Sequence, residues 1–297
     1  MTKEVGMIGL GRMGMGMSER LLNNNISVIG YDRSINKTNL LKRKGGNGTN
    51  SVKDLVSKLS SKKKIVWLML PAGRVSDNMI KELIPLLNYG DVIVNGANSF
   101  YKNAEENASW CRKVGIVFFD VGISGGIHGL KKGYTLMIGG PKTEFKHLEP
   151  LCKVLAPENG YGYFGDVGSG HYVKSVHNII EYVYLQGIAE GLELLDKKKI
   201  DLVKTTKVWQ HGSVINSWLI DLTTKALNRK DFKRIKPEID SVTIQELQET
   251  KKSVKGFAPA FDIAVKIRKD HSKNFSLGKR TIAAVRNEFG GHEVKKK

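Results

Sequence analysis

The chain has 297 residues, of which 40% are hydrophobic, so it is long enough for two domains with apolar cores. Its two cysteines, Cys111 and Cys152, exclude a disulfide scaffold and a cysteine-rich metal site, and they favour a reducing, cytoplasmic location. No apolar run is long enough to cross a bilayer and no residues have a metal-ligand spacing, so we expect neither a membrane partner nor a bound metal.

The formal net charge of +19 indicates an anionic partner. One explanation is nucleic acid, and the other is an anionic small-molecule substrate in a protein that is rich in lysine. The lysines form short, dispersed clusters, as at residues 62–64 and 295–297, and no aromatic residues are interleaved with them. This pattern favours the anionic substrate over nucleic acid.

The first 31 residues have the layout of a dinucleotide-binding unit. Residues 5–8 and 26–31 are apolar strands, and a helix is expected between them through about Leu22. The first strand leads into the G-x-G-x-x-G motif Gly9-Leu10-Gly11-Arg12-Met13-Gly14. In such a turn the glycines allow the sharp bend, the approach of a pyrophosphate and close helix packing, and the helix N-terminus attracts the anion. We therefore expect these six residues to bind the cofactor.

Asp32 follows the second strand, where a carboxylate accepts hydrogen bonds from the adenosine ribose and repels a 2′-phosphate. This position predicts NAD as the cofactor. The adjacent Arg33 could hold a 2′-phosphate, so NADP stays possible.

The next segments alternate between strands and helices. Strands are expected at 64–70, 91–95, 116–121 and 134–138, and helices at 75–84 and 103–112. This alternation predicts an α/β Rossmann domain with a doubly wound, mostly parallel sheet. The loop Leu70-Pro71-Ala72 follows a strand, where such sheets hold ligands, so it is a further candidate for cofactor binding.

Residues 160–170 are rich in glycine and are interpreted as the seam between two domains. We place the dinucleotide-binding domain at 1–165 and a helical substrate and dimerisation domain at 166–297. Helical patterns occupy 171–196, 201–228, 242–253 and 257–270, so the second domain is expected to be all-α.

The helix expected at 171–196 has two unlike faces. One arc of about 100° holds an amine, an imidazole, an amide and a carboxyl group, from Lys174, His177, Asn178 and Glu181. The other side holds Val173, Val176, Ile180 and Val183. The polar arc suits a polar ligand, although a solvated surface helix with an incidental Lys/Glu pair would give the same pattern.

Five motifs together resemble the 6-phosphogluconate dehydrogenase (decarboxylating) family in its shorter form, within the β-hydroxyacid dehydrogenase superfamily. They are the glycine turn at 9–14, Gly96-Ala97-Asn98-Ser99-Phe100-Tyr101-Lys102, Ser124-Gly125-Gly126, the run 174–182 and the ending 286–292. The run with His177-Asn178 and Glu181-Tyr182, and the ending Phe289-Gly290-Gly291-His292, make the narrower assignment.

The resemblance implies roles for single residues. Lys174 matches the general base and Glu181 the general acid, and Asn98 lies next to both the cofactor and the substrate. The other residues that match substrate contacts are Ser124, Gly125, Gly126, His177, Asn178, Tyr182 and Arg268. Arg286 and His292 match residues that reach into the neighbouring subunit's site, which implies at least a homodimer.

The implied reaction is oxidative decarboxylation of 6-phosphogluconate to ribulose 5-phosphate and carbon dioxide with reduction of NAD or NADP, a step of the pentose phosphate pathway. For this chemistry Glu181 is expected to lie against an apolar wall that keeps it protonated. The chain departs from the family at Ala97, at Ile179 and at Asp240-Ser241-Val242-Thr243, where a basic phosphate contact and a tryptophan are usual. Two alternatives stay open: a non-decarboxylating dehydrogenase of a smaller acid, and a nucleotide-sensing protein that binds nucleic acid.

Overall fold

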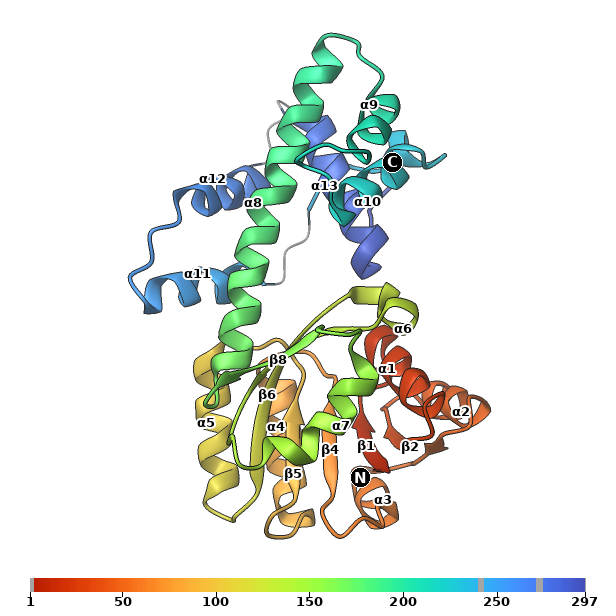
Figure 1. Cartoon of the computed structure of the whole chain (residues 1–297), viewed down its shortest axis with the longest axis vertical. Helices are drawn as coiled ribbons and strands as arrows, with labels where there is room; N and C mark the ends of the chain where they lie inside the picture. The colour runs from red at the N-terminus through yellow and green to blue at the C-terminus, as the bar shows by residue number, and fades with distance from the viewer. Residues whose placement is uncertain (1–2, 240–242, 271–274, 297) are drawn as a thin grey trace. The chain divides into compact units, whose positions relative to one another are not determined.

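A computed structural model describes residues 3–239, 243–270 and 275–296 (Figure 1). The chain forms two compact units, Met1–Ser175 and Val176–Lys297. The first unit is a sheet covered by helices, and the second is built from helices. The α/β domain followed by a helical domain that the sequence predicts is therefore confirmed.

The described part of the first unit contains one eight-stranded sheet with the order β3-β2-β1-β4-β5-β6-β7-β8. Neighbouring strands are parallel except for β6 and β7, which are antiparallel. The strand bounds are Glu4–Ile8 (β1), Ser27–Tyr31 (β2), Asn47–Gly48 (β3), Ile65–Leu68 (β4), Val92–Asn95 (β5), Val117–Ser124 (β6), Thr135–Gly139 (β7) and Tyr161–Gly165 (β8). The strand order reverses beside β1, which creates the switch point where doubly wound sheets bind ligands.

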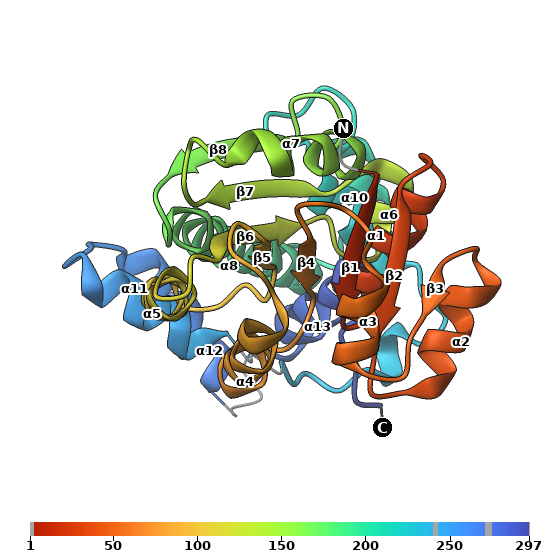
Figure 2. The same cartoon turned by 90° about the horizontal axis from the view of Figure 1, so that it is seen from below.

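Helices cover both faces of this sheet. They are α1 (Arg12–Leu22), α2 (Ile35–Arg43), α3 (Val52–Lys58), α4 (Arg74–Leu83), α5 (Tyr101–Arg112), the short α6 (Gly129–Lys132) and α7 (Phe145–Leu155). Side chains alternate along each strand, so Val5 and Met7 pack in one hydrophobic cluster with α1 and α7, whereas Ile8 packs in another with α3, α4 and α5. Figure 2 shows α7 on one side of the strands and α3 and α4 on the other.

Several elements of the first unit are not anticipated by the sequence pattern. Strand β8 lies inside the glycine-rich segment 160–170 and pairs in parallel with β7. Its sequence, Tyr-Gly-Tyr-Phe-Gly, has no continuous apolar run, so only pairing with a distant strand reveals it. Helix α7 contains Pro150, which hides its helical pattern. Helices α2 and α3 are short and polar.

The second unit begins within α8 (Ser169–Lys197). Its other helices are α9 (Leu202–Trp209), α10 (Trp218–Leu227), α11 (Ile244–Ser253), α12 (Pro259–Lys269) and α13 (Ser276–Gly290). The main hydrophobic cluster joins α10 to α13, with Leu222 and Ala226 packed near Ile282 and Val285. This cluster forms the base on which the chain after α13 lies.

The structure adds two details to the helical pattern of this unit. The helical segment 201–228 consists of α9 and α10, separated by a turn in which Gly212 has a φ of 74°. The hydroxyl of Ser217 accepts a hydrogen bond from the Ile220 N–H and thereby starts α10 anew. Helix α13 was not expected at all. Residues 240–242, where the sequence departs from the family, lie outside the described residues.

Candidate active site

The glycine turn that joins β1 to α1 is closely packed at Gly9 and Gly14. Gly9 has a φ of 93°, and a Cβ there would lie 2.4 Å from the Met69 carbonyl oxygen. A Cβ on Gly14 would lie 1.9 Å from the Gly9 oxygen, so only glycine lets the helix pack so closely. At Gly11, by contrast, a Cβ would meet no described atom within 4 Å. Gly11 thus borders open space in front of the helix.

A dinucleotide fits this turn. Gly11 is the N-cap of α1 and the first turn of α1 contains no acidic residue, so its backbone N–H groups and dipole can receive a pyrophosphate without repulsion. Arg12 is exposed and Met13 is partly buried against the core. The open space at Gly11 therefore lies at the N-terminus of α1, where a phosphate would bind.

Asp32 lies directly beside the glycine turn. Its carboxylate accepts hydrogen bonds from the Leu10 N–H at 2.8 Å and the Ser34 N–H at 2.9 Å. Lys37, on α2, forms an ion pair with the same carboxylate at 3.3 Å. Arg33 is exposed. Asp32, which the sequence predicts to bind the ribose, therefore has two basic neighbours. Arg33 is the next residue in the chain, and Lys37 contacts the carboxylate directly.

The remaining cofactor candidates also follow strands at the carboxyl edge of the sheet. Leu70-Pro71-Ala72 follows β4, and Gly73, with a φ of 78°, turns this loop into α4. Asn98 follows β5 and has a φ of 50°. Its side chain accepts a hydrogen bond from the Ile123 N–H at 2.8 Å and donates one to the Ile123 carbonyl at 3.2 Å. Asn98 thereby fixes its loop to the end of β6.

The segment Ser124-Gly125-Gly126 ends β6 with two left-handed residues, because Gly125 and Gly126 have φ values of 111° and 52°. Lys174, on α8, packs against the same strand and is 7% exposed. A Cβ on Gly122 would lie 2.4 Å from the Lys174 Cβ, so glycine is required at that position. The structure thus brings Lys174 to strand β6, two residues before Ser124.

In the second unit, Arg268 is a buried cation. It is 5% exposed, and none of its three side-chain nitrogens has a hydrogen-bond partner among the described residues. Its guanidinium lies 3.4 Å from the centre of the Tyr182 ring. The pKa of Arg268 is lowered to about 10, chiefly by burial and also by the charge of Arg286, while Tyr182 and Glu181 oppose the shift. Four candidate residues from α8, α12 and α13 therefore meet here.

Within the chain, Arg286 and Glu181 both act electrostatically on Arg268, with opposite signs. The roles that the resemblance implies for Arg286 in a neighbouring subunit and for Glu181 as the acid stay predictions. Thr243 lies here too, with its hydroxyl 3.4 Å from the Tyr182 hydroxyl.

The apolar face of helix α8 is partly exposed in this chain. Ile180 is 62% exposed, and Val173, Val176 and Val183 are half-buried. The His177 Nδ1 lies 3.1 Å from the Asn178 Oδ1, within hydrogen-bond distance. Both polar and apolar faces of α8 are thus partly accessible, which the amphipathic pattern did not predict.

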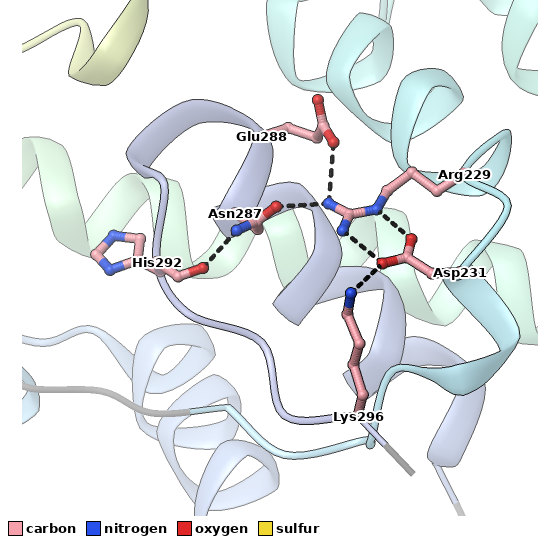
Figure 3. Close-up of polar contacts among 6 residues, drawn as sticks. All are labelled: Arg229, Asp231, Asn287, Glu288, His292 and Lys296. Carbon is pink, nitrogen blue, oxygen red and sulfur yellow. Dashed lines mark hydrogen bonds and ion pairs between the residues drawn. The ribbon is translucent and has the colours of Figure 1, made fainter.

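His292 lies in a segment that is tied down after α13 (Figure 3). Arg229 binds both carboxylate oxygens of Asp231, at 2.9 and 3.1 Å, and donates to Asn287 at 2.5 Å and Glu288 at 3.1 Å. Asn287 in turn donates to the His292 carbonyl at 2.6 Å. His292 itself is exposed.

The described residues contain neither a metal-binding cluster nor a helix that could cross a membrane. No three His, Cys, Asp or Glu side chains gather in a way that could hold a metal ion. No helix among these residues has the length and apolar character needed to cross a membrane.

Comparison with known sequences places the chain. Residues 4–165 match the NAD binding domain of 6-phosphogluconate dehydrogenase, and residues 170–265 match its C-terminal domain. Bacillus subtilis YqeC, whose name assigns it to these enzymes provisionally, is 37% identical over 99% of this chain and 100% of its own. The NAD(+)-dependent, decarboxylating 6-phosphogluconate dehydrogenase of Haloferax volcanii is 35% identical over 99% of both chains.

Solved structures agree. Plasmodium falciparum 6-phosphogluconate dehydrogenase superposes with a TM-score of 0.82 at 27% identity, over 96% of this chain and 64% of its own. Mycobacterium tuberculosis 3-hydroxyisobutyrate dehydrogenase shares the fold, with a TM-score of 0.73 at 18% identity over 96% and 100%. Fold and glycine turn define an NAD(P)-dependent oxidoreductase of the β-hydroxyacid dehydrogenase superfamily. Within that class, the chain belongs to the 6-phosphogluconate dehydrogenase family.

Proposed function

We propose that the protein oxidises and decarboxylates 6-phosphogluconate to ribulose 5-phosphate and carbon dioxide, with NAD as the preferred acceptor. The observation that carries this proposal is the buried Arg268, whose donors have no hydrogen-bond partner among the described residues. Glu181 offsets part of its charge, and an anion with several acceptor oxygens would satisfy the donors of this buried guanidinium. A phosphate group supplies both the charge and the acceptor oxygens, whereas a small hydroxy acid has only its carboxylate for this purpose.

Lys174 is the proposed base. It takes the proton from the hydroxyl on carbon 3 of the sugar acid while the hydride leaves that carbon. NAD supplies the acceptor for this hydride when it is bound at the glycine turn. Lys174 is almost completely buried, 7% exposed, where it packs against β6. To act as the base it must be a neutral amine when the substrate binds.

The resulting 3-keto acid loses carbon dioxide because its ketone can accept the electron pair. Protonated Lys174 then donates a hydrogen bond and a proton to the ketone oxygen, which gives the enediol. Glu181 delivers a proton to carbon 1 of this enediol, while Lys174 recovers the hydroxyl proton as the ketone of ribulose 5-phosphate forms. One helix, α8, carries both residues, seven positions or about two turns apart.

Glu181 must carry a proton when it acts as the acid. A phosphate bound to Arg268 would offset the positive charge that faces Glu181.

The remaining roles follow the same proposal. Asn98, Ser124, Gly125, Gly126, His177 and Asn178 hold the sugar acid, and the motif 9–14, Asp32, Arg33 and 70–72 hold the cofactor. Arg286 and His292 complete the site of a second subunit in a homodimer. The enzyme works in the cytoplasm within the pentose phosphate pathway.

The test uses the purified protein with 6-phosphogluconate labelled with ¹³C at carbon 1. Absorbance of the reduced cofactor reports oxidation, and mass spectrometry of the released gas reports decarboxylation. We expect equal amounts of reduced NAD and labelled carbon dioxide. Reduction without labelled gas would instead assign the protein to the non-decarboxylating dehydrogenases, and 3-hydroxyisobutyrate is the matched substrate for that outcome. No reduction with either acid would overturn the proposal.

A further inference from the structure

Asp120, near the middle of β6, is a completely buried carboxylate at the start of α8. Its two oxygens accept hydrogen bonds from the backbone N–H groups of Gly168 and His171, both at 2.7 Å. The Gly168 N–H lies just before the helix and the His171 N–H lies in its first turn, which contains no acidic residue of its own. A carboxylate supplied by a strand thus caps the helix that carries Lys174, and its charge is favourable at the positive end of the helix dipole.

Glycines bring this helix start into direct contact with the sheet. A Cβ on Gly170 would lie 2.4 Å from the Met137 carbonyl oxygen and 2.5 Å from that of Asp120. A Cβ on Gly139 would lie 2.6 Å from the Asp120 carboxylate. The first turn of α8 therefore rests on the backbones of β6 and β7, with no side chain between them that could yield.

A second bond fixes the same turn from β5. The His171 Nε2 lies 3.1 Å from the Asn95 carbonyl oxygen, which can only accept, so Nε2 carries the proton. Burial lowers the pKa of His171, and the nearby Asp120 opposes this shift in part. A neutral imidazole with a defined tautomer therefore anchors α8 to the end of β5, three residues before the loop position Asn98.

We propose that Asp120 is a positioning residue for the reaction: it sets where Lys174 lies relative to β6 and to the edge of the sheet where Asn98 and Ser124 lie. Asp120 fixes the helix through its first turn, and Gly122, two residues later on the same side of β6, receives the Lys174 side chain. This inference rests on the proposed role of Lys174 as the base. Asp120 itself touches no reacting atom.

The main variant is Asp120→Asn, which keeps the shape but replaces one acceptor oxygen by an N–H donor that faces another donor. Displacement of a catalytic group by about 1 Å can cost on the order of 10²-fold in rate. We expect kcat to fall by about that factor with KM values for substrate and cofactor little changed. The deuterium isotope effect on kcat, measured with substrate deuterated at carbon 3, should increase because hydride transfer becomes limiting.

Asp91→Asn is the matched control. Asp91 is also buried in the first unit, and it accepts backbone N–H bonds from Lys64 and Asn88 at 2.8 Å each, but it precedes β5 at the other edge of the sheet. Its loss should lower the melting temperature and leave the isotope effect unchanged. Equal changes in both variants would mean that Asp120 only stabilises the fold, and would overturn the proposal.

A second measurement does not depend on turnover. Competitive acetylation of lysines, read by peptide mass spectrometry, should label Lys174 several-fold faster in Asp120→Asn than in the parent protein. Lys279, which is 2% exposed and lies on α13, serves as the internal reference. Unchanged labelling of Lys174 would refute the positioning role even if the parent protein proved inactive with 6-phosphogluconate. An inactive parent with the expected labelling would count against the proposed function alone.

If Asp120→Asn does not fold, His171→Leu removes the bond to Asn95 and tests the same helix start. His171→Gln keeps a donor near the place of Nε2 and should restore slow Lys174 labelling. Fast labelling in both, or in neither, would contradict the assignment.

Discussion

The guanidinium of Arg268 lies 3.4 Å from the centre of the Tyr182 ring, and this contact replaces the hydrogen bonds that the buried cation lacks among the described residues. Under the proposed function Arg268 binds the phosphate of the substrate, and its burial then costs the free protein stability. We expect Arg268→Met to raise the melting temperature of the free protein and to raise KM for 6-phosphogluconate by about 10-fold to 200-fold, the equivalent of one or two charge-assisted bonds. Calorimetry and steady-state kinetics check the two effects.

Gluconate, which lacks the phosphate, is the control substrate for Arg268→Met. The parent protein and the variant should have similar, poor KM values for gluconate. Inorganic phosphate should raise the melting temperature of the parent protein and not that of the variant. An equal loss of affinity for both acids would show that Arg268 does not bind the phosphate.

Two glycines of the turn should respond differently to alanine. Gly14→Ala would place a Cβ 1.9 Å from the Gly9 oxygen, so we expect a large loss of stability. Gly11→Ala meets no described atom within 4 Å, so its melting temperature should stay close to that of the parent while NAD affinity falls by at least about tenfold. Thermal melts with and without NAD measure both. Normal NAD binding by a stable Gly11→Ala protein would place the pyrophosphate elsewhere.

Asp32 should set the choice of cofactor. Asp32→Ser removes the charge that repels a 2′-phosphate and leaves Lys37 and Arg33 to attract it. We expect the ratio of kcat/KM values for NADP and NAD to rise by at least about tenfold, or roughly 1.4 kcal/mol. Asp54→Ser is the control, because Asp54 also pairs with a lysine, Lys58, but on α3. The same shift in both variants would exclude a specific role for Asp32.

The ion pairs around Arg229 should make the free energy of unfolding depend on pH in the acid range. Hydrogen bonds from Arg229 and Lys296 hold the pKa of the Asp231 carboxyl well below its usual value of about 3.9. The folded state therefore binds this proton less tightly than the unfolded state, and the stabilisation is complete above about pH 4 and is lost as the pH falls further. Asp231→Asn should cost about 1–2 kcal/mol at neutral pH, and this difference should shrink in acid.

Denaturant unfolding at a series of pH values checks the Asp231 prediction. Glu238→Gln is the control, because Glu238 pairs with Lys295 on an exposed part of the same region. Its effect should be small at every pH. A difference for Asp231→Asn that does not change with pH would refute the assigned cause.

Mixed subunits test the shared site. Lys174→Ala and His292→Ala should each be inactive or nearly so. If His292 acts in the neighbouring subunit's site, a mixed dimer contains one site with both native residues, and an equal mixture should regain about a quarter of the parent activity. No recovery after the subunits have exchanged would place His292 in its own chain's site.

Local sequence was sufficient for the glycine turn and Asp32, because the turn, the following helix and the acid belong to one continuous β1-α1-β2 unit. It was not sufficient for β8 or for the Asp120 cap, since each depends on a partner far away in the chain. The break between α9 and α10 was missed because helical periodicity continues on both sides of Gly212. The Arg268 cluster joins three helices, so spacing within any one of them could not show it.

The unbroken α8 has a consequence for how the proposed chemistry could evolve. Lys174 and Glu181 are spaced by the helix itself, so inserting or deleting one residue between them would rotate one side chain by about 100° away from the other. A surface loop tolerates an insertion better than this part of α8, which sets a fixed spacing between Lys174 and Glu181. Descendants of the chain can change what surrounds the two residues more easily than they can change the interval between them.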